Sequence, residues 1–73
     1  MITSYEQLAN AIILLAVKDY RNSLKTIRRN PRSQTANDMK GQCERFFFSQ
    51  WFQALTSVDG KKLAQDLQRE VMA

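Results

Sequence analysis

Residues 43–55 read CERFFFSQWFQAL and decide the fold, because they hold five of the chain's seven aromatic side chains. A chain of 73 residues has room for one hydrophobic core, and large rings dominate the apolar area that such a core buries. On one continuous helix these rings would point in too many directions for a single neighbouring helix to cover. Either the chain turns near Ser49, or another molecule covers some of the rings: Phe46, Phe47, Phe48, Trp51 and Phe52.

A long helix is predicted over residues 4–29. Thr3 and Ser4 are each followed three residues later by Glu or Gln, the pattern of a capping box at a helix start. Asn30 precedes Pro31, which disfavours helical geometry at Asn30 and ends the helix. Apolar residues recur at steps of three and four and predict one core-facing stripe: Tyr5, Leu8, Ile12, Ala16, Tyr20, Leu24 and Ile27.

The rest of the chain predicts shorter helices. Ser33 or Thr35 can cap a second helix over residues 35–48. Ser49 can interrupt that helix and cap a continuation to residue 55, and one unbroken helix to residue 55 is the alternative. Asp59 is a good N-cap for a last helix over residues 60–71. The apolar stripes of the second and last helices are Met39, Cys43, Phe46 and Phe47, and then Leu63, Leu67 and Val71.

The fold class predicted from these elements is all-α. Two glycines and one proline leave few breaks, and the short length gives one domain over residues 1–73. We expect a small bundle of three helices, or four if Ser49 breaks the second, with a long first helix. An antiparallel pair with the last helix laid across its end is the expected arrangement. The first helix would extend beyond such a bundle, and its free end could pair with another copy.

The apolar residues exceed what one small core can hide, which predicts a protein-binding surface. Leu14 lies nearly opposite the predicted stripe of the first helix, so residues 12–17 are apolar almost all round. Phe46, Phe48 and Phe52 point to different sides of the aromatic segment. We expect these four residues to contact a second copy, in a homodimer, or a foreign protein.

Most enzyme classes are excluded by missing residues. The chain has no His, a single Cys and only two isolated glycines, so it lacks a nucleophile–His pair, a zinc ligand set and a phosphate-binding loop. Its seven carboxylates are dispersed along the sequence, so we expect them to be solvated surface groups. Cys43 suits a reducing compartment as a small buried hydrophobe. We therefore expect no catalytic residue, no metal, no cofactor and no small-molecule substrate.

The apolar run over residues 8–17 is too short to cross a membrane, which needs about 20 residues. No basic segment precedes it, as a secretory signal would require. The sequence therefore predicts a cytoplasmic protein without membrane contact.

The net charge of +4 lies entirely in residues 1–36, which predicts a basic face. Lys18, Arg21, Lys25 and Arg28 are spaced by three, four and three, so one helix face is expected to carry them, opposite the apolar stripe. Arg29 and Arg32 follow. Such a row can bind phosphates of nucleic acid or an acidic protein, and a solvated face is the plain alternative.

Residues 43–63 (CERFFFSQWFQALTSVDGKKL), with residues 11–21 (AIILLAVKDYR), resemble a group of short proteins encoded on phages and integrative mobile elements of Gram-positive bacteria. The resemblance covers most of the chain after residue 10. That group has no assigned activity, so no functional residue carries over. The resemblance implies a bacterial, cytoplasmic, mobile-element setting, which favours regulatory or host-binding roles over metabolism.

Together these observations predict a non-enzymatic accessory or regulatory protein of a mobile element that acts by protein–protein binding, with self-association as its expected form. The alternative is a nucleic-acid-binding protein that uses the basic face of the first helix.

Overall fold

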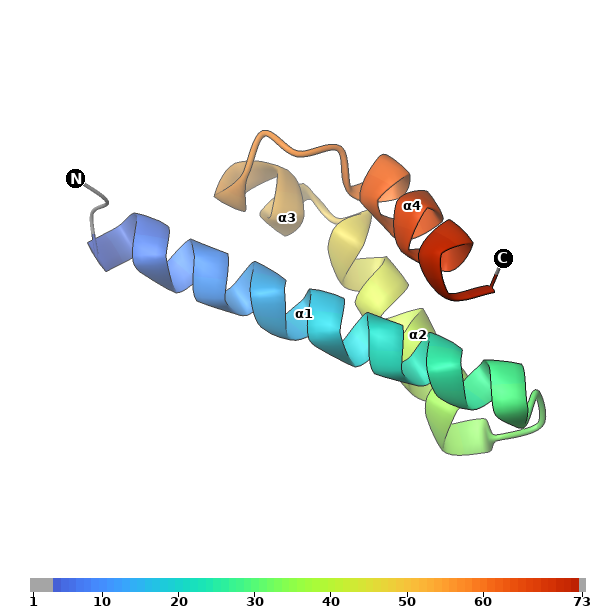
Figure 1. Cartoon of the computed structure of the whole chain (residues 1–73). Coiled ribbons are helices and arrows are strands. Elements are labelled where there is room, and N and C mark those ends of the chain that lie inside the picture. Colours follow the sequence, from blue (N-terminus) through green and yellow to red (C-terminus); the bar gives the residue numbers. More distant parts are fainter. Residues whose placement is uncertain (1–3, 73) are drawn as a thin grey trace.

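The computed structural model describes residues 4–72, which form four helices (Figure 1). These are α1 (Ser4–Arg29), α2 (Gln34–Phe47), α3 (Gln50–Leu55) and α4 (Gly60–Met72). The predicted all-α class and the long first helix are confirmed, and the four-helix alternative with a break at Ser49 is the correct one.

Short polar side chains set the helix starts, as the sequence predicted. The Ser33 hydroxyl accepts from the backbone N–H of Ala36 at 3.3 Å, so Ser33 rather than Thr35 caps α2. The Ser49 hydroxyl accepts from the N–H of Phe52 at 3.1 Å and caps α3. Asp59 Oδ1 accepts from the N–H groups of Lys61 and Lys62 and caps α4. The predicted capping by Thr3 lies outside the described residues.

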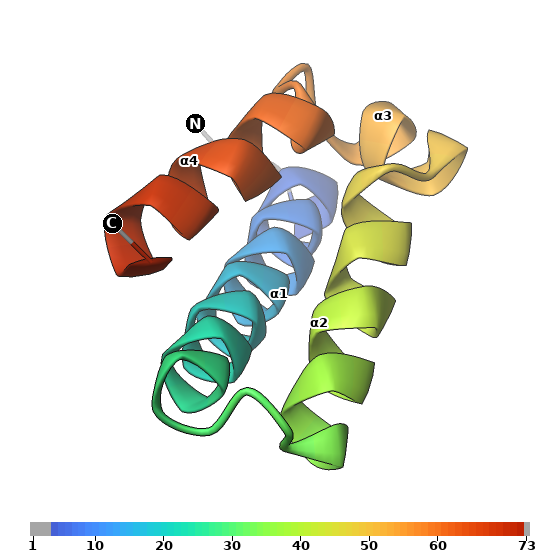
Figure 2. The same cartoon turned by 90° about the vertical axis from the view of Figure 1, so that its right-hand side faces the viewer.

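The helices pack as a hairpin with a third long element on its side. α2 runs back along the second half of α1, and α4 packs against both (Figures 1 and 2). The expectation that the last helix crosses the end of the pair is wrong, because the C-terminal half of α4 bonds to α1 at Tyr20, Arg21 and Arg28. The first half of α1 extends beyond the hairpin, and the molecule measures 42 × 21 × 19 Å.

The core lies where α1, α2 and α4 meet, and rings from the aromatic segment fill it. Phe47 packs edge to face on Tyr20 and Phe52, with ring centroids 5.4 and 5.7 Å apart. Cys43 and Phe47 supply the α2 side as predicted, and Leu67 and Val71 supply the α4 side. The buried cluster comprises Tyr20, Leu24, Cys43, Phe47, Phe52, Ala64, Leu67 and Val71.

One buried polar group joins three helices. The Tyr20 hydroxyl donates to Glu44 Oε2 on α2 and accepts from Gln68 Nε2 on α4, both at 2.8 Å. Lys40 Nζ bonds the same Glu44 oxygen at 2.8 Å. Burial, together with the neighbouring Glu44 carboxylate, raises the pKa of Tyr20 to about 12, although the bond from Gln68 acts in the opposite direction. The phenol therefore stays protonated and keeps both bonds.

The buried stripe of α1 differs from the predicted one in the first half of the helix. Ala9 is buried and Ile13 packs against the core, and Ala16 of the predicted stripe does so as well. Tyr5 and Leu8, which were predicted to face the core, are 66% and 60% exposed. Two apolar stripes, displaced from each other by about one position, therefore run along this half of α1, and the fold buries only one of them.

Candidate functional site

The unburied apolar stripe on α1 is the most distinctive surface of the protein. Tyr5, Leu8 and Leu15 are each at least 60% exposed, and Ile12 between them is half-buried. Their spacing of three, four and three places them in one row along the helix. We call these four residues the α1 seam.

A groove of about 270 Å³ continues from this seam toward α2 and α3. Ile12 and Leu15 form part of its wall, and the indole of Trp51 forms another part. The groove is lined by Ile12, Leu15, Ala16, Asp19, Met39, Gln42, Cys43, Phe46 and Trp51. Apolar side chains thus dominate the lining, and only Asp19 and Gln42 add polar groups.

Trp51 reaches this groove because the chain breaks at Ser49. The Ser49 hydroxyl also donates to the carbonyl of Phe46 at 2.6 Å, which fixes the turn between α2 and α3. After the turn, Phe52 points into the core, while Trp51 remains 58% exposed and packs edge to face on Phe46 at 5.4 Å. The turn therefore places the Phe52 ring in the core and the Trp51 ring at the groove.

The four residues predicted to contact a partner do not form one surface. Phe52 is fully buried, so the expectation that it contacts a partner is wrong. Phe46 lines the groove and is half-buried. Leu14 and Phe48 are 67% and 55% exposed, but neither lines the groove.

The predicted interface residues did not include Leu15 or Trp51, although Trp51 was among the rings that another molecule could cover, and Tyr5 and Leu8 were placed in the core. The signal was present in the spacing of residues 5, 8, 12 and 15, which forms a complete apolar row. Residues 9, 13, 16 and 20 form a second row of the same kind, so spacing alone does not say which row is covered.

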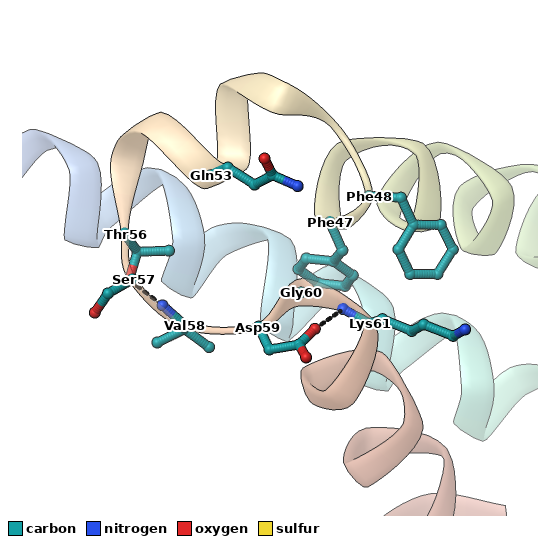
Figure 3. Close-up of a pocket in the computed structure, with 9 residues that line it drawn as sticks. All are labelled: Phe47, Phe48, Gln53, Thr56, Ser57, Val58, Asp59, Gly60 and Lys61. Atoms are coloured by element: carbon teal, nitrogen blue, oxygen red, sulfur yellow. Dashed lines mark hydrogen bonds between the residues drawn. The ribbon is translucent and has the colours of Figure 1, made fainter.

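A second hollow, of about 610 Å³, lies where α2, α3 and the start of α4 come together (Figure 3). Exposed Phe48 and Val58 give it an apolar rim. Two of its polar side chains bond the backbone locally: the Asp59 carboxylate caps α4, and Thr56 Oγ1 accepts from the N–H of Val58 at 3.2 Å.

Some side chains of the predicted basic row bond to α4, and the others do not. The Arg21 guanidinium binds the Glu70 carboxylate through two hydrogen bonds of 2.6 and 3.1 Å, and this pair raises the pKa of Arg21 and lowers that of Glu70. Arg28 donates to the carbonyl of Val71 at 2.8 Å. The expectation that the row lies opposite the core is thus wrong for Arg21 and Arg28, which lie beside α4. Lys18, Lys25, Arg29 and Arg32 are exposed.

The only thiol in the chain lies in a protected position. Cys43 is 6% exposed, which confirms it as a core residue. Burial raises its pKa, and the carboxylates of Asp19 and Glu44 add to the effect. A thiol kept protonated in this way is a poor nucleophile. Among residues 4–72, no three carboxylate or Cys side chains come close enough to hold a metal ion.

None of the four described helices combines the length and hydrophobicity that a bilayer span requires. Comparison of the chain with family models, curated proteins and solved structures gave no significant match. The choice of candidate site therefore rests on the geometry of this chain alone. By that criterion, the α1 seam with the adjoining groove is the surface best suited to contact another molecule.

Proposed function

We propose that this protein is a non-enzymatic accessory or regulatory factor, in the mobile-element setting that its sequence suggests, and that it acts by binding protein. The observation that supports this is the α1 seam and its groove. They gather exposed leucine, tyrosine and tryptophan side chains into one continuous strip. Contiguous apolar surface of this kind marks an interaction site, whereas single exposed apolar residues are normal.

The composition of the strip favours a protein partner. Interfaces are enriched in Trp and Tyr, which act as anchors when they enter apolar pockets. Trp51 stands at the edge of such a groove, held in place by Phe46. Residues 4–17 of α1 contain one charged side chain, Glu6, so the first half of this helix presents no cationic row to phosphates.

Paired variants test the proposal, because Leu14 and Leu15 are neighbours with similar exposure, 67% and 60%, and lie on different sides of α1. Immobilised wild type, Leu15→Lys and Leu14→Lys would be used to capture proteins, including tagged copies of the chain itself, from lysate with and without nuclease treatment. We expect a specific protein that the wild type and Leu14→Lys retain and that Leu15→Lys loses. Binding of that purified protein would then be measured directly by calorimetry.

Two results would overturn protein binding through the strip. One is an identical set of retained proteins for all three baits. The other is the loss of every specific protein after nuclease treatment, which would show that nucleic acid bridged them.

Nucleic-acid binding is the second candidate, supported by the cations that α4 leaves exposed. Lys18, Lys25 and Arg29 lie on the outward face of α1 at i, i+7 and i+11, a row of about 16 Å at 1.5 Å per residue. A short row of this kind matches a few phosphates of one strand.

Its test is the salt dependence of duplex binding. Replacing Lys25 and Arg29 by Ala should lower the slope of log K against log salt by about 1.8, at about 0.9 per phosphate contact. Lys61→Ala with Lys62→Ala removes the same charge from α4 and should leave most of the slope in place. Absence of binding at low salt, or equal effects of both double variants, would rule out this face.

A further inference from the structure

We infer that the partner of the α1 seam is a second copy of this chain, paired antiparallel across a two-fold axis near residue 10. This inference rests on the proposed function, since it names the occupant of the surface assigned above. In this arrangement Tyr5 lies opposite the second copy's Leu15, and Leu8 lies opposite the second copy's Ile12.

The spacing of the seam supports helix–helix pairing. Steps of three, four and three are the pattern of a coiled-coil seam, in which apolar residues occupy the a and d positions of a heptad. Residues 5 and 12 take one position and residues 8 and 15 the other, so the row reads the same after a two-fold rotation. A surface that matches itself in this way is what an isologous interface requires.

Small residues border the seam on both sides. Ala9 and Ala16 lie on the side toward the core, and Ala11 lies on the outer side. Side chains of this size allow two helix axes to approach closely. The seam itself carries no charge, and Asp19 is the one charged side chain in the lining of the adjoining groove.

The accessible surface is larger than that of a typical compact monomer of this mass. It amounts to 5397 Å² for 8.5 kDa, whereas a compact monomer of that mass exposes about 4,700 Å². The radius of gyration is 13.0 Å, compared with about 11 Å for a compact domain of this length. The excess of about 700 Å² reflects the protruding first half of α1, and it is of the same order as the roughly 800 Å² that each partner buries in a stable interface.

The position of α2 decides the direction of pairing. α2 lies along the second half of α1 and reaches the first half only at the groove beside Ile12 and Leu15 (Figure 1). A parallel partner would extend its own second half, with α2 attached, into the space that the first copy's α2 occupies. An antiparallel partner centred near residue 10 overlaps only the two free halves, and each remaining half with its bundle points away from the other.

The same register brings a ring into the groove. Tyr5 of the second copy, opposite Leu15, would lie against the wall that Leu15 and Trp51 form. Asp19 and Gln42 are the polar groups in that lining, so they are available to the phenol hydroxyl. The groove and the seam thereby form one interface.

Sedimentation equilibrium over a series of protein concentrations tests the pairing. The wild type should approach twice the chain mass of 8.5 kDa. Leu15→Lys, which alters both halves of the interface, should raise the dimer dissociation constant by at least about 100-fold. Leu8→Lys, in the first half of α1, should raise the dimer dissociation constant by a similar factor. It replaces Leu15→Lys in the test if that variant loses its helical circular dichroism. Leu14→Lys should remain within about threefold of wild type.

Disulfide formation tests the register. Ala11→Cys lies beside the two-fold axis and should form an interchain disulfide under mild oxidation, whereas Asn10→Cys, which points away from the seam, should not. The wild type, whose single Cys43 is buried, gives the background level of interchain disulfide.

Three outcomes would overturn the inference: a wild type that stays monomeric throughout, a Leu14→Lys defect as large as that of Leu15→Lys, or cross-linking of Asn10→Cys without Ala11→Cys. A monomer that still captures a foreign protein through Leu15 would remove the homodimer and leave the proposed protein-binding function standing. A monomer that captures none would remove both.

Discussion

The two halves of α1 belong to one unbroken helix and yet have opposite surroundings. In the second half, Tyr20 and Leu24 are at most 1% exposed and lie under α2 and α4. In the first half, Tyr5 and Leu8 are apolar and more than half exposed. The sequence supplies both halves with apolar rows at helical spacing, so the difference arises from where the other helices pack.

This contrast separates residues that hold the fold from residues that are free to bind. The second half is fixed by tertiary contacts on two sides. The first half has about three turns and is covered on one side only, along Ala9, Ile13 and Ala16, and isolated helices of that length are marginal in water. It therefore gains from being covered, which agrees with the partner that we propose for it.

A matched pair of leucines gives the largest expected difference between the halves. Leu24→Ala leaves a cavity in the core and should cost about 2–5 kcal/mol, a large part of the stability of so small a domain. Leu8→Ala, on the exposed row, should change stability by less than about 0.5 kcal/mol when measured at concentrations where the chain is monomeric. Urea denaturation followed by circular dichroism measures both.

Similar costs for the two leucine variants would break the comparison, because they would show that the first half is packed as firmly as the second. The dilute condition matters: above the dimer dissociation constant, Leu8→Ala would also lose interface contacts.

The covered half depends on how closely α4 begins beside the end of α2. A Cβ built at Gly60 would overlap the backbone carbonyl of Phe47, and backbone cannot shift aside as the end of a flexible side chain can. Gly60→Ala should therefore push α4 outward and cost about 1–3 kcal/mol. Gly41→Ala is the control, because its Cβ would meet no atom within 4 Å, and in a helix interior the change should stabilise by about 0.5–1 kcal/mol. Opposite signs in thermal melts would support this account, and equal signs would contradict it.

The local features of this fold could be predicted from the sequence. Ser33, Ser49 and Asp59 act on backbone donors only two or three residues away, so their short-range patterns identify the helix starts. The bounds of α1 agree with the prediction, because Pro31 ends the helix by a steric effect on its neighbour.

Features that depend on the path of α4 could not be predicted. The rows that begin at Tyr5 and at Ala9 have the same period, and only the position of the other helices decides which is buried. For the same reason, spacing placed Arg21 and Arg28 on one face but did not reveal that Glu70 and the Val71 carbonyl face them.

A matched pair of tyrosines gives the next largest contrast. Tyr20→Phe removes two hydrogen bonds in the core and leaves Gln68 without its partner, at a cost of about 1–2 kcal/mol. Tyr5→Phe, on the exposed row, should have no measurable effect on a monomer. Chemical denaturation at neutral pH compares the two, and a larger loss for Tyr5→Phe would contradict the assignment of the core.

The same residue predicts a pH dependence. The pKa of Tyr20 rises from 10.0 to about 12 in the folded protein, so its contribution is complete below pH 10 and is lost as pH rises toward 12. Other groups also titrate there, so the comparison is between wild type and Tyr20→Phe. Their difference in stability should shrink above pH 10, and a difference that stays constant would show that the phenol is not held protonated.

The smallest expected effect concerns the edge between α1 and α4. Arg21 and Glu70 are both exposed, so Arg21→Ala should shift the unfolding midpoint less than any core variant above, and added salt should reduce the shift further. Because Arg21 lowers the pKa of Glu70, the contribution of the pair is present above the ordinary carboxyl range and is lost as pH falls through the lowered pKa. In the Arg21→Ala variant, this loss of stability at acid pH should disappear. The Glu70→Gln variant should lack the same loss. If Arg21→Ala instead costs as much as Tyr20→Phe, then α4 is held at its exposed edge rather than by the buried network, and the stability of the covered half of α1 would have to be assigned to different residues.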